Sequence, residues 1–142
     1  MKIWQAIFLG ILMFFYFSPA SIPQISWREP PETFGSLTLK TDCGKLKIYQ
    51  KNGRFDGFRA DRVYYSFYLN RLYKITLNYS SFYDFMEDAR KISSSLDVNI
   101  IDVKVYEKGS TIIKITHTPF KNSIEFIYKL YYPRLKLIEK CN

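Results

Sequence analysis

Histidine, cysteine and glycine are scarce in this chain, and each shortage excludes a kind of site. The 142 residues contain one histidine, His117, six glycines and two cysteines, Cys43 and Cys141. A lone histidine and cysteines without CxxC spacing argue against a structural zinc site. The sequence also lacks a glycine-rich phosphate loop and a nucleophile elbow. We therefore expect no metal and no cofactor.

Carboxylates at a fixed catalytic spacing are missing as well. The candidate acids have no spacing that sets one beside another, as glycoside cleavage requires; they are Asp56, Asp61, Asp102 and Glu107. His117, at the end of a predicted strand, is typical of a polar cap on the core. The alternative is a small basic secreted hydrolase, specifically a nuclease, in which His117 acts with a carboxylate such as Glu125 and an arginine. The balance favours a protein that is not an enzyme.

The long hydrophobic run of the chain lies at its amino terminus. Lys2 precedes an apolar run over residues 3–17, which ends in Ser18, Pro19 and Ala20. This pattern is typical of a secretory signal peptide, so we predict cleavage after Ala20 and an exported protein, periplasmic or secreted. Such a run spans roughly 22 Å as a helix, short of the roughly 30 Å hydrocarbon core. An uncleaved membrane anchor formed by residues 3–17 is the alternative, and membrane contact is expected only in that case.

Positive charge exceeds negative charge. The formal net charge is +8, and removal of Lys2, the single charge in residues 1–20, leaves +7. A basic exported domain is attracted to anionic surfaces such as phospholipid headgroups, acidic glycans or nucleic acid, although the charge also serves solubility alone. The partner stays unknown, with an envelope protein or an anionic polymer as candidates.

The length and a hydrophobic content of 47% suit one core. We predict a signal peptide over residues 1–20, a Pro-rich linker over 21–35 and a single domain over 36–142. The two cysteines lie near the two ends of that domain. In an oxidising compartment they are expected to form a disulfide that joins these ends.

Alternation of apolar and polar residues predicts several strands. Residues 37–39 and 46–48 form two short strands, and Asn52 with Gly53 favours a tight hairpin turn. The next hairpin joins residues 63–69 to 72–79 through a predicted three-residue loop near Asn70. A loop with an odd number of residues places the alternate side chains of both strands on the same face of the sheet. On the first strand these are Val63, Tyr65, Phe67 and Leu69, and on the second they are Tyr73, Ile75, Leu77 and Tyr79.

One helix follows the hairpin. Ser81 and Asp84 form a variant of the capping box. Helical spacing then predicts a buried stripe of Phe82, Phe85, Met86, Ala89, Ile92 and Leu96, opposite Glu87, Asp88, Arg90 and Lys91. Strands return over residues 98–106, 111–117 and 124–132, with Ile101 and Val103 on the core face, and Pro133 ends the last strand. Residues 134–141 are left as a short strand or a helical turn.

This order predicts an α+β fold, in which an antiparallel sheet of hairpins and a meander carries one amphipathic helix on one face. The segment Phe67-Tyr68-Leu69-Asn70-Arg71-Leu72-Tyr73-Lys74-Ile75, followed by a helix capped at Ser81, resembles a pattern in small uncharacterised bacterial exported proteins. The resemblance covers about thirty residues and implies no activity.

The sheet face away from the helix is the predicted binding surface. Alternation assigns tyrosines and lysines to it; they are Tyr64, Tyr68, Lys74, Lys104, Tyr106, Lys114, Lys129 and Tyr131. Tyrosines beside lysines stack on rings and attract anionic groups, although both types also suit an ordinary solvated strand surface. We therefore expect a non-enzymatic exported binding or structural module of the cell envelope or extracellular space.

Overall fold

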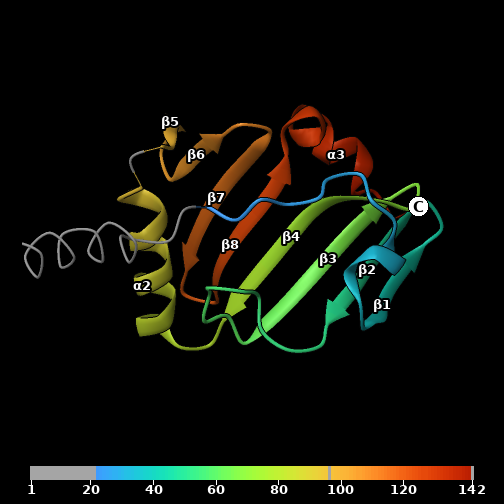
Figure 1. The fold of residues 1–142 in the computed structure, drawn as a ribbon, viewed down its shortest axis with the longest axis horizontal. Coiled ribbons are helices and arrows are strands. Elements are labelled where there is room, and N and C mark those ends of the chain that lie inside the picture. Colours follow the sequence, from blue (N-terminus) through green and yellow to red (C-terminus); the bar gives the residue numbers. More distant parts are fainter. Residues whose placement is uncertain (1–21, 96, 142) are drawn as a thin grey trace, which may run out of the picture.

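A computed structural model describes residues 22–95 and 97–141, so the predicted signal peptide lies outside the described residues. Eight strands form one sheet in the order β1-β2-β3-β4-β8-β7-β6-β5, and every neighbouring pair is antiparallel (Figure 1). The elements are η1 (Pro31–Phe34), β1 (Leu37–Cys43), β2 (Leu46–Lys51), β3 (Arg62–Tyr68), β4 (Arg71–Tyr79), α2 (Phe82–Ser93), β5 (Asn99–Asp102), β6 (Val105–Lys108), β7 (Thr111–Thr118), β8 (Lys121–Tyr128), η2 (Lys129–Arg134) and α3 (Leu135–Ile138). The prediction of a fold dominated by an antiparallel sheet is confirmed.

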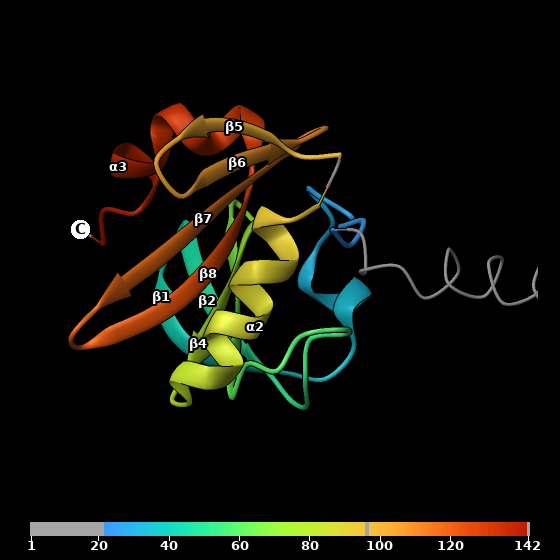
Figure 2. The ribbon, with the colours of Figure 1, turned by 90° about the vertical axis from the view of Figure 1, so that its left-hand side faces the viewer.

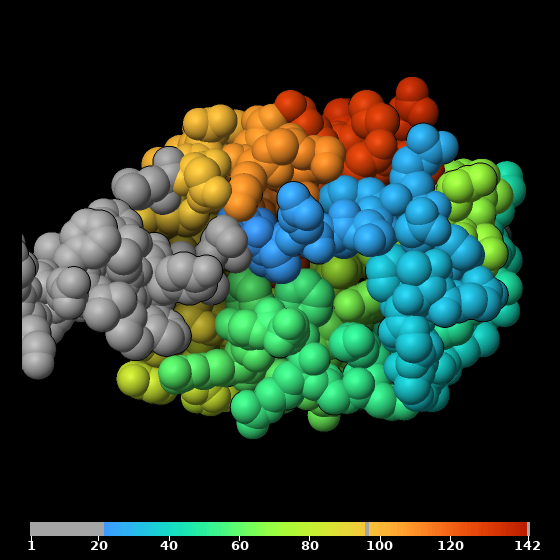
Figure 3. Space-filling model, viewed as in Figure 1, coloured from blue at the N-terminus to red at the C-terminus, as the bar shows by residue number. Residues whose placement is uncertain are grey.

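The main core lies between one face of the sheet and three covering segments. These are α2, an N-terminal arm (residues 22–35) and a loop that joins β2 to β3 (the 52–61 loop). Figure 2 shows the three segments on one side of the sheet and α3 on the other. In the space-filling view the arm, in blue, and the 52–61 loop, in green, cover much of this face (Figure 3).

The expected linker packs against the domain along its length. Ile22 and Pro31 are buried, and the indole Nε1 of Trp27 donates to Thr111 Oγ1 at 3.0 Å. The backbone N–H of Arg28 donates to the carbonyl of Leu72, and the N–H of Leu72 donates to Glu29. The arm is therefore a docked part of the domain, because apolar side chains between its prolines reach the sheet.

Helix α2 begins as predicted but buries a narrower stripe. The Ser81 hydroxyl accepts from the Asp84 backbone N–H at 3.2 Å, and Phe85 and Ile92 join the core. Phe82 and Met86 are exposed, so their predicted burial is wrong, and Leu96 lies outside the described residues. Asp88, predicted on the solvent side, is fully buried. The 52–61 loop causes this difference, because it covers the side of the helix that carries Asp88.

The hairpin of β3 and β4 differs from the prediction in its turn and in the pairing of its strands. Leu69 and Asn70 both have positive φ, 50° and 65°, and form a two-residue turn in place of the three-residue loop. Phe67 pairs with Leu72 and Ser66 with Lys74, which leaves Tyr73 as a bulged extra residue. Tyr73 therefore packs on the opposite face from Ile75, and its predicted place beside Ile75 and Leu77 is wrong.

Two further turns differ from the sequence prediction. Asn52 and Gly53 do not close a tight hairpin, because they open the ten-residue 52–61 loop. The strand predicted over residues 98–106 is divided into β5 and β6 by a turn in which Lys104 has a φ of 55°. Ile101 and Val103 are consequently exposed, and their predicted place in the core is wrong.

The second face of the sheet is covered at one end by the C-terminal segment. β8 ends at Tyr128, earlier than predicted, and residues 129–138 form η2 and then α3, so the helical alternative for the tail is correct. Tyr73 and Leu46 pack with Ile138, and Val105, Ile112 and Ile127 form a neighbouring cluster. The Cys43–Cys141 disulfide, predicted from the sequence, joins the end of β1 to this segment. No helix within residues 22–95 and 97–141 has the length and apolar character to cross a membrane.

Candidate functional site

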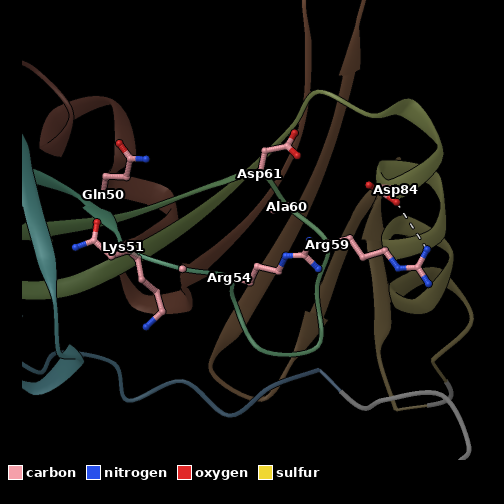
Figure 4. Close-up of a pocket in the computed structure, with 9 residues that line it drawn as sticks. Gln50, Lys51, Arg54, Arg59, Ala60, Asp61 and Asp84 are labelled. Atoms are coloured by element: carbon pink, nitrogen blue, oxygen red, sulfur yellow. Dashed lines mark ion pairs between the residues drawn. The ribbon is translucent and has the colours of Figure 1, made fainter.

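A pocket of about 620 Å³ opens beside the 52–61 loop (Figure 4). It lies between the end of β2, the loop and the first turn of α2. Its lining residues are Gln50, Lys51, Asn52, Gly53, Arg54, Arg59, Ala60, Asp61 and Asp84. We call this site the basic pocket, because three cations, Lys51, Arg54 and Arg59, contribute to it.

The loop sequence explains how the arginines reach the surface. In the segment from Arg54 to Arg59, the two aromatic residues Phe55 and Phe58 are buried, and their ring centroids lie 5.7 and 5.6 Å from that of Phe126. Gly57 has a φ of 80°, a conformation that favours glycine and allows the chain to reverse between the two rings. The hydrophobic anchors thus leave the flanking arginines exposed on the rim of the basic pocket.

Polar contacts join the 52–61 loop to α2 and β4. The Asp88 carboxylate accepts from the Arg59 backbone N–H at 2.7 Å and from the Tyr79 hydroxyl at 2.6 Å. Burial, together with the bond to Asp88, raises the pKa of Tyr79 well above its usual value, so this hydroxyl stays a donor. The Lys91 ammonium lies 3.4 Å from Asp88 and donates to the carbonyl of Gly57 at 3.0 Å. The loop is therefore fixed to α2 by a buried carboxylate.

Several charged side chains of the basic pocket already contact other groups of the protein. Arg59 extends to Asp84, with 3.7 Å between charged atoms. The Asp61 carboxylate accepts from the Ser80 hydroxyl and, at 2.5 Å, from the Ser80 backbone N–H, and these bonds lower the pKa of Asp61. The Lys51 ammonium lies 5.6 Å from the centre of the Tyr65 ring, whose hydroxyl has its pKa raised to about 12 by burial. Both carboxylates stay charged, so the three cations and two anions of the lining leave one positive charge in excess.

The predicted Tyr/Lys surface is not one continuous face. Lys74 is mostly buried and forms ion pairs with Glu125, at 3.4 Å, and Glu139. Tyr68 on β3 and Tyr131 on η2 pack around Tyr73, and the ring centroid of Tyr131 lies 5.9 Å from that of Tyr73.

The remaining residues of that predicted surface lie apart from one another. Tyr106 packs against the main core, on the face opposite to the predicted one, because β6 begins only after the turn at Lys104. Lys129 pairs with Glu107, Lys104 lies in the β5–β6 turn, and Lys114 is exposed on β7. Tyr64 is half-buried on β3, beside Gln50 and Thr76 in the sheet register.

His117 lies on the helix side of the sheet. Its ring centroid is 5.3 Å from that of Phe82 and 6.0 Å from that of Phe85, and its Nδ1 lies 2.5 Å from Asn122 Oδ1. Glu125 is on the other side, where it pairs with Lys74. The structure therefore does not bring together the carboxylate and histidine of the hydrolase hypothesis. Within the described residues no group of three potential metal ligands occurs either.

The basic pocket was missed by the sequence analysis because Asn52 and Gly53 indicated a tight turn there. The signal that could have found it is the spacing of Arg54, Phe55, Phe58 and Arg59, in which paired aromatics are flanked by cations. Such a segment is too hydrophobic for a solvated loop and too charged for a strand interior. Comparison with known proteins gives no further guide, since no family model, curated protein or solved structure matches the chain.

Proposed function

We propose that this chain is an exported, non-enzymatic binding module that holds an anionic partner at the basic pocket. The observation that carries the proposal is the gathering of Lys51, Arg54 and Arg59 around one concave surface. Of these cations, only Arg59 is ion-paired among the residues that the structure describes. Arginine and lysine donors of this kind bind phosphate and carboxylate groups through charge-assisted hydrogen bonds.

Export is supported by the amino-terminal sequence pattern and by the disulfide. A bond between Cys43 and Cys141 is compatible with an oxidising compartment. We also propose to class the fold as α+β, since Phe85 and Ile92 give α2 an apolar side against the sheet. The net charge of +8 suits attraction to an anionic partner in that compartment.

The Tyr/Lys sheet face remains the competing location for the same function. Its exposed lysines are Lys104, Lys114 and Lys129, of which Lys129 is paired with Glu107, and all three lie on other elements than the basic pocket. No observation favours the hydrolase centred on His117. The two locations for binding can be separated by one titration.

We expect sodium tripolyphosphate, a small flexible polyanion, to shift the backbone NMR signals of residues 50–54 and 59–61. Lys51→Ala and Arg54→Ala should each weaken its binding about fivefold or more, the scale of one lost charge-assisted hydrogen bond. The matched controls Lys104→Ala and Lys114→Ala should bind as the unchanged protein does. Added salt should weaken binding in all four variants. If the control variants lose binding and the pocket variants keep it, the anionic partner occupies the sheet face and the pocket assignment is wrong.

A further inference from the structure

Exposed hydrophobic side chains gather at the end of the molecule where α2 begins. Phe120, in the turn between β7 and β8, is 97% exposed, and Phe82, Tyr83 and Met86 on α2 are between 40% and 67% exposed. We call these four residues the tip patch. Single exposed apolar residues are common on protein surfaces, but an almost fully exposed phenylalanine at the same end of the molecule as three other exposed hydrophobic side chains indicates an interaction site.

The patch is continuous with the basic pocket. Phe120 lines a second pocket, of about 520 Å³, together with Ser80, Asp61 and Arg62. Ser80 is two residues from Phe82, and Asp61 belongs to both pockets. The ring of Phe82 also contacts His117, which is the second-last residue of β7 and so lies next to the β7–β8 turn. Aromatic and basic groups therefore share one surface.

Several cations lie on the same side of the molecule as Phe120 and the two pockets. Lys121 follows Phe120 directly in the chain, and Arg62 lines the pocket that Phe120 closes. Arg54, Arg59 and Lys51 lie beyond Asp61 in the basic pocket. The carboxylates nearby are fewer and have partners in the protein: Asp61 accepts from Ser80, Asp84 forms an ion pair with Arg59, and Glu87 forms one with Arg90. The surface thus combines exposed rings with an excess of positive charge.

The β7–β8 turn presents Phe120 in a fixed position. The Phe120 backbone N–H donates to the Thr118 hydroxyl at 3.3 Å, and that hydroxyl donates to the carbonyl of Lys121 at 3.3 Å. Figure 2 shows the turn projecting beyond the neighbouring elements. A projecting aromatic residue suits insertion into a soft interface, whereas protein partners place their main contacts in well-packed, desolvated pockets.

We propose that the tip patch inserts into the surface of an anionic phospholipid membrane while the basic pocket binds lipid phosphate. This inference rests on the proposed function, since it names the source of the anion. Aromatic rings at headgroup depth and nearby lysines and arginines are the two contributions that hold peripheral proteins on anionic bilayers. It requires no membrane-spanning segment.

The test measures insertion at position 120 itself, so that a retained N-terminal segment cannot imitate it. In Phe120→Trp, the added tryptophan fluorescence should shift to shorter wavelength with vesicles of equal parts phosphatidylcholine and phosphatidylglycerol, and brominated lipid should quench it. Leu137→Trp on α3 is the matched control, since Leu137 is an exposed apolar residue on the other side of the sheet. Its signal should not change. Phosphatidylcholine vesicles without anionic lipid should give a much weaker response.

A second arm separates this inference from the proposed function. Phe120→Ala should weaken vesicle binding about tenfold, the scale of one buried phenyl ring, and leave tripolyphosphate binding unchanged. Arg54→Ala should weaken both. If tripolyphosphate binds but position 120 gives no vesicle signal, or if Leu137→Trp is quenched equally, membrane insertion is wrong and the proposed function stands. If neither probe binds, both are wrong. Tight binding of single-stranded nucleic acid without vesicle binding would assign the surface to a nucleic acid instead.

Discussion

A single buried carboxylate, Asp88, connects the core to the basic pocket. It accepts from the Arg59 backbone N–H and the Tyr79 hydroxyl, and its ion pair with Lys91 offsets the burial of its charge. Removing one member of a buried ion pair or hydrogen bond lowers the free energy of unfolding far more than removing an exposed ion pair does. Asp88 therefore fixes where the 52–61 loop presents its arginines.

We predict that Asp88→Ala lowers the free energy of unfolding by about 3 kcal/mol, because a buried hydroxyl and a backbone N–H lose their acceptor. Asp88→Asn should cost less, since its amide oxygen still accepts one bond. Urea denaturation measures both changes. The matched control is Glu87→Ala on the same helix, whose exposed pair with Arg90 should contribute at most about 1 kcal/mol. Equal stability of the Asp88→Ala and Glu87→Ala variants would contradict the anchoring role.

At the scale of single elements, the strands were predictable and their exceptions were not. The alternation of apolar and polar residues identified the β3–β4 hairpin, which contains Val63 and Leu77, because a sheet with one buried face imposes a period of two residues. The bulge at Tyr73 breaks that period, and it places Tyr73 in a buried cluster with Ile138 on the second face of the sheet. This contact joins distant parts of the chain. The neighbouring bond between Lys74 and Glu139, for example, links residues that are 65 positions apart in sequence.

The burial of Asp88 was unpredictable for the same reason. Helical spacing places Asp88 beside polar residues, and no local rule reveals that a loop residue 29 positions earlier, Arg59, will cover it. The basic pocket depends on that loop, so the site could not be derived before the tertiary contacts were known. The disulfide was accessible from sequence, because the count of two cysteines permits one intramolecular pair.

The Cys43–Cys141 disulfide holds the C-terminal segment on the sheet. We predict that Cys43→Ser with Cys141→Ser lowers the free energy of unfolding by about 4 kcal/mol, because the bond closes a loop with a sequence separation of 98 residues. The same change should loosen α3, which supplies Ile138 to the small cluster with Tyr73. Thermal unfolding measures the first effect and hydrogen exchange of residues 135–138 the second.

The control for this prediction is the oxidised protein itself. Its mass should be lower by two hydrogen atoms than that of the reduced form, and neither cysteine should react with an alkylating agent. Two reactive thiols in the native protein would show that the bond does not form. A stability unchanged by the double substitution would show that the C-terminal segment is held by packing alone.

At the scale of the whole molecule, the N-terminal arm and the C-terminal segment of the described residues cover opposite faces of one sheet. The C-terminal segment lies over Tyr73 and Ile127, and the N-terminal arm lies over the main core. Ile22, only 4% exposed, is the first described residue of the arm. The arm is therefore part of the folded domain, and a signal peptide that ends at Ala20 would leave one residue, Ser21, before this buried side chain.

This arrangement gives the last prediction, on the mature form that the proposed export would produce. Protein recovered from the envelope or the medium should begin at Ser21, as amino-terminal sequencing can determine, and a chain that begins at Pro30 should be less stable by about 3 kcal/mol or more. The shorter chain loses the burial of Ile22 and the Trp27 contact with Thr111, whereas the chain from Ser21 keeps both. Recovery in the cytosol with Met1 in place would contradict export, and recovery in the membrane with Met1 in place would identify residues 3–17 as an anchor. If the chain from Pro30 unfolds at the same temperature as the chain from Ser21, the arm contributes nothing to stability and this prediction is wrong.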